Sequence, residues 1–164
     1  MAEVDTTRAL LVMALQDLED GEAALIERLP AVAQAARDED LKALIEQDRV
    51  RGEAQHKRLC DTLEEFGEKA GESQNIWLRA ILDDADNDAE TIAAGPLRDI
   101  ALTGALRKGK QSERVSYETA LAFARRMDLP EAAQRLQACR DEEEAADEAL
   151  AAILARLVET LAPG

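Results

Sequence analysis

The first part of the sequence carries an apolar stripe that only a helix can bury on one side. Its positions recur at alternating intervals of four and three residues, and all but one of them are leucine: Leu11, Leu15, Leu18, Glu22, Leu25 and Leu29. This spacing is typical of the buried face of an amphipathic α-helix. Glu22 is the exception, because a carboxylate in a buried stripe is costly unless it is paired or bound to a cation. The stripe therefore predicts both a long helix and a polar site inside the fold.

The same pattern returns 91 residues further along the chain, without a gap. Apolar positions fall on apolar positions: Leu11 on Leu102, Leu15 on Leu106, Ile45 on Leu136 and Leu59 on Leu150. Glu22 falls on Glu113, so the exceptional carboxylate is repeated as well. Two helical hairpins, 5–66 and 97–161, are therefore predicted to pack about a pseudo-twofold axis. Such packing brings equivalent polar positions of the two hairpins toward one point.

The composition supports an all-α fold. Aromatic residues make up only 2% of the chain, whereas hydrophobic residues reach 46%, with Leu and Ala prominent among them. Such a composition is typical of a helical bundle with a Leu and Ala core. We predict a single domain over residues 1–164, an antiparallel four-helix bundle with an additional short helix at 75–92 between its second and third long helices. Pro30 is expected to kink or shorten the first helix, and Trp77 to pack against the end of the bundle.

The charge balance narrows the classes of partner. The formal net charge is −15, and such a surface repels phosphate backbones, so we expect no nucleic-acid partner. No apolar run approaches the roughly 18 residues of a membrane span, and the N-terminal segment lacks the features of a signal peptide. Cys60 and Cys139 are too few for a disulfide framework. We therefore expect a cytoplasmic protein that does not bind membranes.

Six polar side chains are candidate metal ligands. Two are the repeated carboxylates, and four form pairs three residues apart on the other two long helices: Glu22, Glu113, Glu53 with His56, and Glu144 with Asp147. Residues three apart share a helix face, and a bundle core can hold two metal ions with one Glu from each of two helices and a Glu-x-x-His from each of the others. The set predicts an iron or manganese centre with one nitrogen donor, because His56 is the only histidine. Glu143 is an alternative to Glu144, since consecutive glutamates let the register slip.

Segments of all four long helices carry a family resemblance that covers nearly the whole chain: Asp17 to Glu22 leading to Arg28-Leu29-Pro30, His56 to Leu59, Ser116-Tyr117, and Asp141 to Asp147. In these segments the chain resembles the ferritin-like superfamily and, within it, the bacterial stress-associated YciE/YciF family. The resemblance implies a four-helix bundle with an extra short helix, a homodimer, and a di-iron centre.

The sequence departs from the pattern of that family in two helices. Arg51 and Gln55 stand where the second helix of the family carries a carboxylate and a histidine, and Lys110 and Gln111 replace a glutamate and a histidine in the third. Lys110 lies one turn before Glu113, so its ammonium group can neutralise that carboxylate in place of a metal ion. Two functions therefore stay open. One is a metal centre with oxygen or peroxide chemistry, and the other is a non-catalytic structural or interaction protein whose metal site has become a buried Glu, Lys and Arg network.

Overall fold

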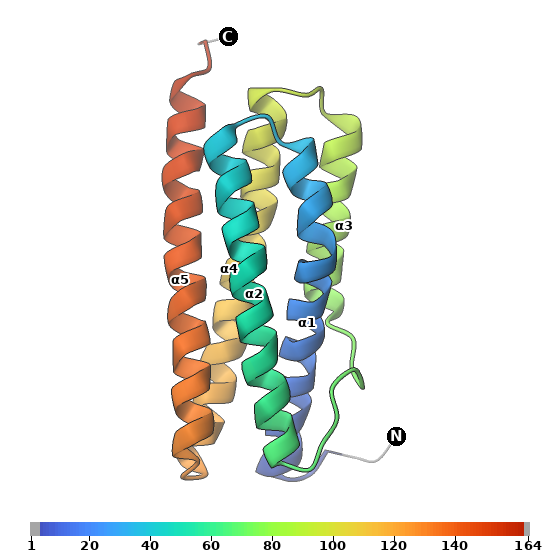
Figure 1. Ribbon diagram of the computed structural model, residues 1–164, viewed down its shortest axis with the longest axis vertical. Helices are drawn as coiled ribbons and strands as arrows, with labels where there is room; N and C mark the ends of the chain where they lie inside the picture. Colours follow the sequence, from blue (N-terminus) through green and yellow to red (C-terminus); the bar gives the residue numbers. More distant parts are fainter. Residues whose placement is uncertain (1–3, 163–164) are drawn as a thin grey trace.

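The computed structural model describes residues 4–162, and these residues form five α-helices and no β-strand (Figure 1). The helices are, in chain order, α1 (Thr7–Ala35), α2 (Glu39–Glu65), α3 (Ile76–Thr91), α4 (Pro96–Arg126) and α5 (Pro130–Glu159). The predicted all-helical fold is confirmed, and a shorter helix lies between the second and third long helices. Among the described residues, no helix combines the length and the apolar character needed to cross a membrane.

Local sequence signals set where the helices begin. Three helices are capped by a polar side chain that accepts a hydrogen bond from a backbone N–H three residues later: Thr6 from Ala9, Asp38 from Leu41 and Asn75 from Leu78. These bonds satisfy N–H groups that have no partner within the helix. Pro96 and Pro130 occupy the first positions of α4 and α5, where the missing N–H of proline removes no helical hydrogen bond.

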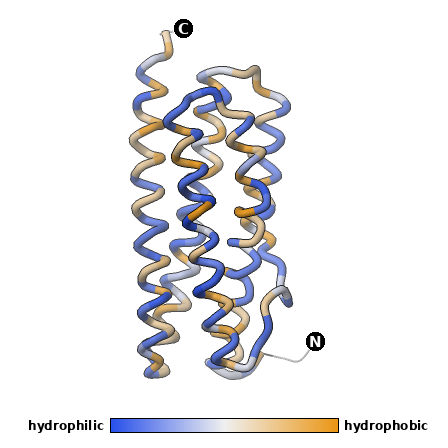
Figure 2. The backbone as a smooth tube through the Cα atoms, viewed as in Figure 1, coloured by the Kyte–Doolittle hydropathy of each residue, from blue (hydrophilic) through white to orange (hydrophobic). Residues whose placement is uncertain are grey.

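The long helices form two antiparallel hairpins, α1 with α2 and α4 with α5 (Figure 1). The hairpins pack on each other through α1 against α4 and α2 against α5, while α3 packs against α1 and α4. Figure 2 shows hydrophobic and hydrophilic residues alternating in short stretches along each helix. This alternation is expected where each helix buries one face and exposes the other.

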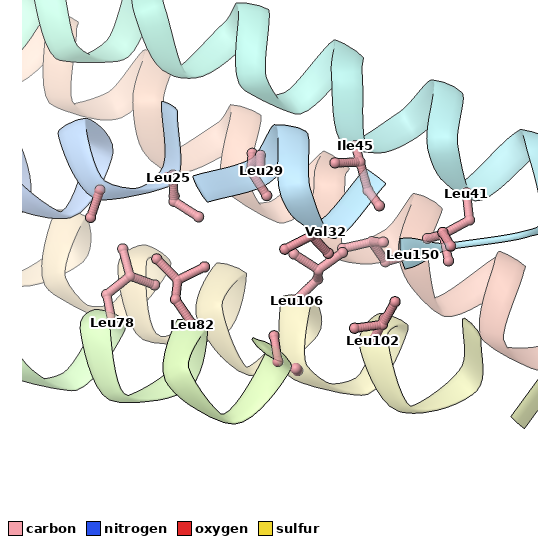
Figure 3. Packing of buried hydrophobic residues seen from close by; sticks show 14 residues of the cluster. Leu25, Leu29, Val32, Leu41, Ile45, Leu78, Leu82, Leu102, Leu106 and Leu150 are labelled. Atoms are coloured by element: carbon pink, nitrogen blue, oxygen red, sulfur yellow. The ribbon is translucent and has the colours of Figure 1, made fainter. Parts of the chain in front are cut away.

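The apolar core is divided into two clusters along the bundle axis. One cluster joins the second half of α1 to the first parts of α2 and α4, to α3 and to Leu150 of α5, and its side chains point toward one another in Figure 3. The other joins the first half of α1 to the last parts of α2 and α4 and to the first part of α5. Buried charged side chains lie between the two clusters along the helices: Glu19, Glu22, Asp48, Lys110, Glu113 and Glu143. A polar layer therefore crosses the middle of the bundle.

At two places the structure decides between expectations or corrects one. Of the two effects expected of Pro30, shortening does not occur, since α1 continues past it to Ala35. The Trp77 side chain is 73% exposed and does not pack into the bundle. The buried face of α3 includes Leu78, and one residue corresponds to about 100° of rotation around a helix, so Trp77 points away from that face.

Candidate functional site

Three carboxylates from three helices meet in the middle of the bundle. Glu22 of α1, Glu113 of α4 and Glu143 of α5 are each at most 1% exposed, and one oxygen atom of each lies within 4.8 Å of the others. The sequence repeat led us to expect Glu22 and Glu113 at one point, and the structure brings them together. Glu143 occupies the place that was expected for Glu144.

A lysine ammonium group lies among these carboxylates. Lys110 of α4 is 1% exposed, and its Nζ atom lies 2.9 Å from Glu143 Oε2, 3.1 Å from Glu113 Oε2 and 3.0 Å from Asp48 Oδ2. The two glutamate Oε2 atoms meet Nζ at ion-pair distance but without hydrogen-bonding angles, so neither has a hydrogen-bond donor. We call Glu22, Asp48, Lys110, Glu113 and Glu143 the central cluster. It joins all four long helices around one positive charge.

Two uncharged side chains bind the carboxylates of the central cluster. Tyr117 of α4 donates its hydroxyl hydrogen to Glu22 Oε1 across 2.6 Å, and Gln55 of α2 donates from Nε2 to Glu143 Oε1 across 2.9 Å. Both donors are fully buried. Glu22 Oε2 and Glu113 Oε1 have no hydrogen-bond partner among the described residues. The cluster therefore holds more acceptors than the surrounding side chains supply donors.

Burial and mutual repulsion keep protons on the central cluster. Burial, reinforced by Glu143, raises the pKa of Glu22 to about 8, although Lys110 and Tyr117 act in the opposite direction. Burial and the neighbouring Glu22 also raise the pKa of Glu113 well above its ordinary value. Burial alone would lower the pKa of Lys110, but the surrounding carboxylates hold it well above its ordinary value. At neutral pH Lys110 is therefore charged, and Glu22 favours its protonated form.

The predicted ligand pair on α2 lies outside the central cluster. The Glu53 side chain is 52% exposed and forms an ion pair with Arg49 at 2.6 Å. His56 faces α1, where its Nε2 atom lies 2.7 Å from Glu19 Oε1. Glu53 and His56 therefore do not converge on Glu22, contrary to the expectation from the sequence.

The predicted pair on α5 is also bound elsewhere. Glu144 forms ion pairs with Arg140 and Arg114. Asp147 accepts hydrogen bonds from Arg107 at 2.7 Å and from Gln111 at 3.0 Å. Guanidinium groups neutralise both carboxylates at the edge of the bundle, so neither side chain reaches the central cluster.

On both helices the predicted ligand pair lies one residue beyond the pair of positions that faces the central cluster. The buried positions beside the central cluster are Gly52 and Gln55 on α2, and Glu143 and Ala146 on α5. Because one residue turns a helix by about 100°, the next position along faces a different side. The offset of 91 residues still holds, since it pairs Gly52 with Glu143 and Gln55 with Ala146.

Comparison with known proteins places almost the whole chain in one family. The family described as a domain of unknown function, DUF892, matches residues 6–162. The chain belongs to the DUF892 family. None of the curated proteins that were compared matches it.

Two solved structures share the fold of this DUF892 protein. The E. coli stress protein YciF is 23% identical with a TM-score of 0.91, and the match covers 96% of this chain and 100% of that chain. YcfI, a putative structural protein from Rhodopseudomonas palustris, is 22% identical with a TM-score of 0.86, covering 98% of this chain and 97% of that chain. The resemblance to the YciE/YciF family is thereby confirmed, and the five helices are arranged as in YciF.

The central cluster of this DUF892 protein departs from the paired-metal pattern at three positions. That pattern needs a Glu-x-x-His on each of two helices, but α2 carries Gly52 and Gln55 there, and α5 carries Ala146 in place of a histidine. The one histidine of the chain contacts Glu19 instead. The Lys110 ammonium also lies between the carboxylates that would have to share the metal ions. These residues do not fit a di-iron or di-manganese centre.

Asp48 and Gln55 belong to the site but were not among the predicted ligands, although the family pattern had placed Gln55 at a ligand position. Both lie on a stripe of α2 with the same alternating spacing as the first helix: Leu41, Ile45, Asp48, Gly52, Gln55 and Leu59. A polar residue on a buried stripe needs a partner inside the fold. The alternating intervals of four and three residues along α2 are therefore the sequence signal that identifies these two residues.

Proposed function

We propose that this protein works as a non-catalytic structural or interaction protein. It is a ferritin-like four-helix bundle of the YciE/YciF type in which a lysine takes the place of metal ions. The observation that carries the proposal is the position of Lys110. Its Nζ atom lies within 3.1 Å of carboxylate oxygens from α2, α4 and α5. That place, among carboxylates of several helices, is the one a cation takes in a metal-binding bundle.

An ammonium group can supply the charge of a cation but not its chemistry. Buried carboxylates need a compensating positive charge, and Lys110 supplies one from within the chain. An ammonium group has no redox states and no open coordination position, so it cannot polarise or activate a bound oxygen species as a metal ion does. The raised pKa values of Glu22 and Glu113 lower the negative charge that Lys110 has to compensate.

The two structural relatives support the class of function. YciF is described as a stress protein and YcfI as a putative structural protein, so we propose a structural role in the stress response of a bacterial cytoplasm.

We also propose that the protein forms a homodimer. Ile76 and Trp77, in the first turn of α3, are 68% and 73% exposed, and aromatic side chains are enriched in protein interfaces. Light scattering tests the dimer, and Trp77→Ser is expected to shift it toward the monomer.

A second candidate function is metal-dependent oxygen or peroxide chemistry. It is favoured by the convergence of Glu22, Glu113 and Glu143, whose oxygens lie within 4.8 Å of one another. Three carboxylates suit one hard divalent cation such as Mn²⁺ or Fe²⁺. Such a cation would have to displace the Lys110 ammonium group. The proposed structural role requires no such displacement.

Metal content distinguishes the two functions. Untagged protein purified without chelator is expected to contain far less than one equivalent of iron or manganese per chain by elemental analysis, and to take up none during anaerobic loading with Fe²⁺. Ferrous oxidation and peroxide consumption are expected at the rate of the buffer. One or more equivalents of iron or manganese, lost in Glu113→Gln and kept in Glu53→Gln, would overturn the proposal. Glu53 is a suitable control because its side chain lies on the surface.

A further inference from the structure

The single histidine contacts a carboxylate and a thiol at a place separate from the central cluster. His56 Nε2 lies 2.7 Å from Glu19 Oε1, and Cys60 Sγ lies 3.7 Å from Nδ1 and 3.8 Å from Nε2 of the same ring. One donor atom from each of the three residues lies within 4.8 Å of the others. A nitrogen, an oxygen and a sulfur donor therefore converge on one point between α1 and α2.

The local structure holds the three donors in place. His56 and Cys60 are four residues apart on α2, so their side chains lie on one face, and Glu19 meets them from α1. The other oxygen of Glu19 accepts a hydrogen bond from the Gly71 N–H at 2.8 Å. Gly71, in the loop between α2 and α3, has a φ of +77°, which glycine adopts without strain. A carboxylate oriented by a second hydrogen bond in this way is common at metal sites.

We propose that Glu19, His56 and Cys60 form a binding site for one Zn²⁺ ion. Zinc binds thiolate sulfur at about 2.3 Å and imidazole nitrogen or carboxylate oxygen at about 2.0–2.2 Å, so tetrahedral donors lie about 3.3–3.6 Å apart. The two separations from His56 Nε2, 2.7 Å and 3.8 Å, lie on either side of this range. Side-chain rotations, of which that of Cys60 is the larger because its Sγ lies almost equally far from both ring nitrogens, bring the donors to zinc-binding distances. The ion then takes the place of the hydrogen bond between Nε2 and Glu19, and the neutral imidazole keeps its one proton on Nδ1.

The donor set selects zinc over iron and manganese. Thiolate and imidazole are ligands for zinc, whereas sites made of carboxylates alone suit harder cations. The His56 side chain is 31% exposed and that of Glu19 is 6% exposed, so solvent reaches the site from the histidine side and a water molecule can complete the tetrahedron. None of the three donors belongs to the central cluster, so the zinc site does not depend on the role of Lys110.

Zinc binding exchanges a proton for the metal ion. An ordinary cysteine thiol has a pKa of about 8.5, so Cys60 carries its S–H proton at neutral pH in the absence of metal. Zinc binds the thiolate, so the S–H proton passes to solvent and at least one proton is released per ion.

The second hairpin has no copy of this site. The offset of 91 residues pairs the three donors with residues of other chemistry: Glu19 with Lys110, His56 with Asp147 and Cys60 with Ala151. The site therefore belongs to the first hairpin alone and is not a consequence of the internal repeat.

Calorimetric titration of the full reduced chain with Zn²⁺ tests the proposal. We expect one ion per chain, with at least one proton released when buffers of different ionisation enthalpy are compared. His56→Gln and Cys60→Ser are each expected to weaken binding by at least about tenfold, since each removes a direct ligand. Glu53→Gln, one turn before His56 on the same helix, is the matched control and should bind as the wild type does. Thermal melting confirms that each variant is folded, and glutamine at position 56 keeps an N–H donor for Glu19.

Co²⁺ in place of zinc gives a readout that reports the thiolate alone. We expect a near-ultraviolet sulfur-to-cobalt charge-transfer band in the wild type and in Glu53→Gln, and none in Cys60→Ser. Absence of one-to-one zinc binding, or equal zinc affinity in the wild type, His56→Gln and Cys60→Ser, would overturn the proposal. Neither result bears on the role of the central cluster, because the iron and manganese content of Glu113→Gln tests that role separately.

Discussion

The Nζ atom of Lys110 lies 2.9 Å from Oε2 of Glu143, and neither side chain is more than 1% exposed. This contact joins α4 to α5 in the middle of the bundle, where water does not screen the charges. The same ammonium lies 3.0 Å from Asp48 and 3.1 Å from Glu113. Because each buried carboxylate is costly without a positive partner, the packing of three long helices depends on this one side chain.

Lys110→Met should destabilise the protein strongly at neutral pH. Removing one partner of a buried ion pair leaves uncompensated charge and costs about 3–5 kcal/mol, while methionine keeps most of the apolar stem of lysine. Urea denaturation followed by circular dichroism measures the free energy of unfolding. Lys108→Met is the matched control, because Lys108 is 64% exposed and pairs with Asp84 on the surface. The control should lose about 1 kcal/mol or less, and equal losses in both variants would contradict the assigned role of Lys110.

Stability should fall as the pH rises from about 5 to 8, above the range in which carboxylates with lowered pKa values titrate. Glu22→Gln should reduce that fall. The pKa of Glu22 is about 8 in the folded protein, against an ordinary value of 4.5. Its stabilising contribution is fully present below pH 4.5 and is lost as the pH rises to about 8, because the folded state keeps a proton that the unfolded chain releases. One such proton changes the free energy of unfolding by at most about 1.4 kcal/mol per pH unit.

The measurement for Glu22 is the slope of the free energy of unfolding against pH, from urea denaturation at several pH values. Glutamine cannot ionise and still accepts the hydrogen bond from Tyr117. Part of the slope should remain in Glu22→Gln, because the pKa of Glu113 is raised as well. Glu53→Gln, a surface change, should leave the wild-type slope unaltered. Identical slopes in Glu22→Gln and the wild type would show that the Glu22 carboxyl is not held in its protonated form.

Tyr117→Phe should cost about 1–3 kcal/mol, because it leaves a buried acceptor without its donor. The lost bond is the 2.6 Å hydrogen bond from the Tyr117 hydroxyl to Glu22 Oε1. Since that bond lowers the pKa of Glu22, its loss should raise this pKa further. The chain has a single tyrosine, so phenolate absorbance gives an independent check. Burial raises the pKa of Tyr117 well above 10, and the phenolate signal should therefore appear only when the protein unfolds in alkali.

The fold could be predicted from the sequence because the leucine spacing is strong and is repeated. Leu11 and Leu102 mark the same position of two hairpins, and each stripe extends over several turns, so single polar residues do not obscure it. The burial of Glu22 and Glu113 followed from the same pattern. Their place in the stripe fixed which way they point before any distance was known.

The site could be predicted only in part, because chemistry and spacing pointed to different residues on α2 and α5. The Glu-x-x-His spacing favoured Glu53 and His56, whereas the apolar stripe runs through Gly52 and Gln55. On α5 the stripe includes position 143 and not Glu144: Leu136, Cys139, Glu143, Ala146 and Leu150. The sequence placed Lys110 beside Glu113 on one helix. Its contacts with Asp48 and Glu143 depend on distances between helices, which spacing along the chain does not specify.

Restoring the missing donors should turn the central cluster into a metal site. The variant carries four changes, which supply the Glu-x-x-His pattern and remove the ammonium: Gly52→Glu, Gln55→His, Ala146→His and Lys110→Ala. A Cβ atom at position 52 would lie 3.4 Å from Glu22 Oε2 and 3.5 Å from Ile26 Cγ1, so the backbone there has room for a β-carbon. The donors then match a paired-metal bundle, and elemental analysis after anaerobic Fe²⁺ loading should find about two ions per chain. The matched control keeps Lys110 and should bind far less, because the ammonium repels the metal; equal uptake would contradict the proposed role of Lys110.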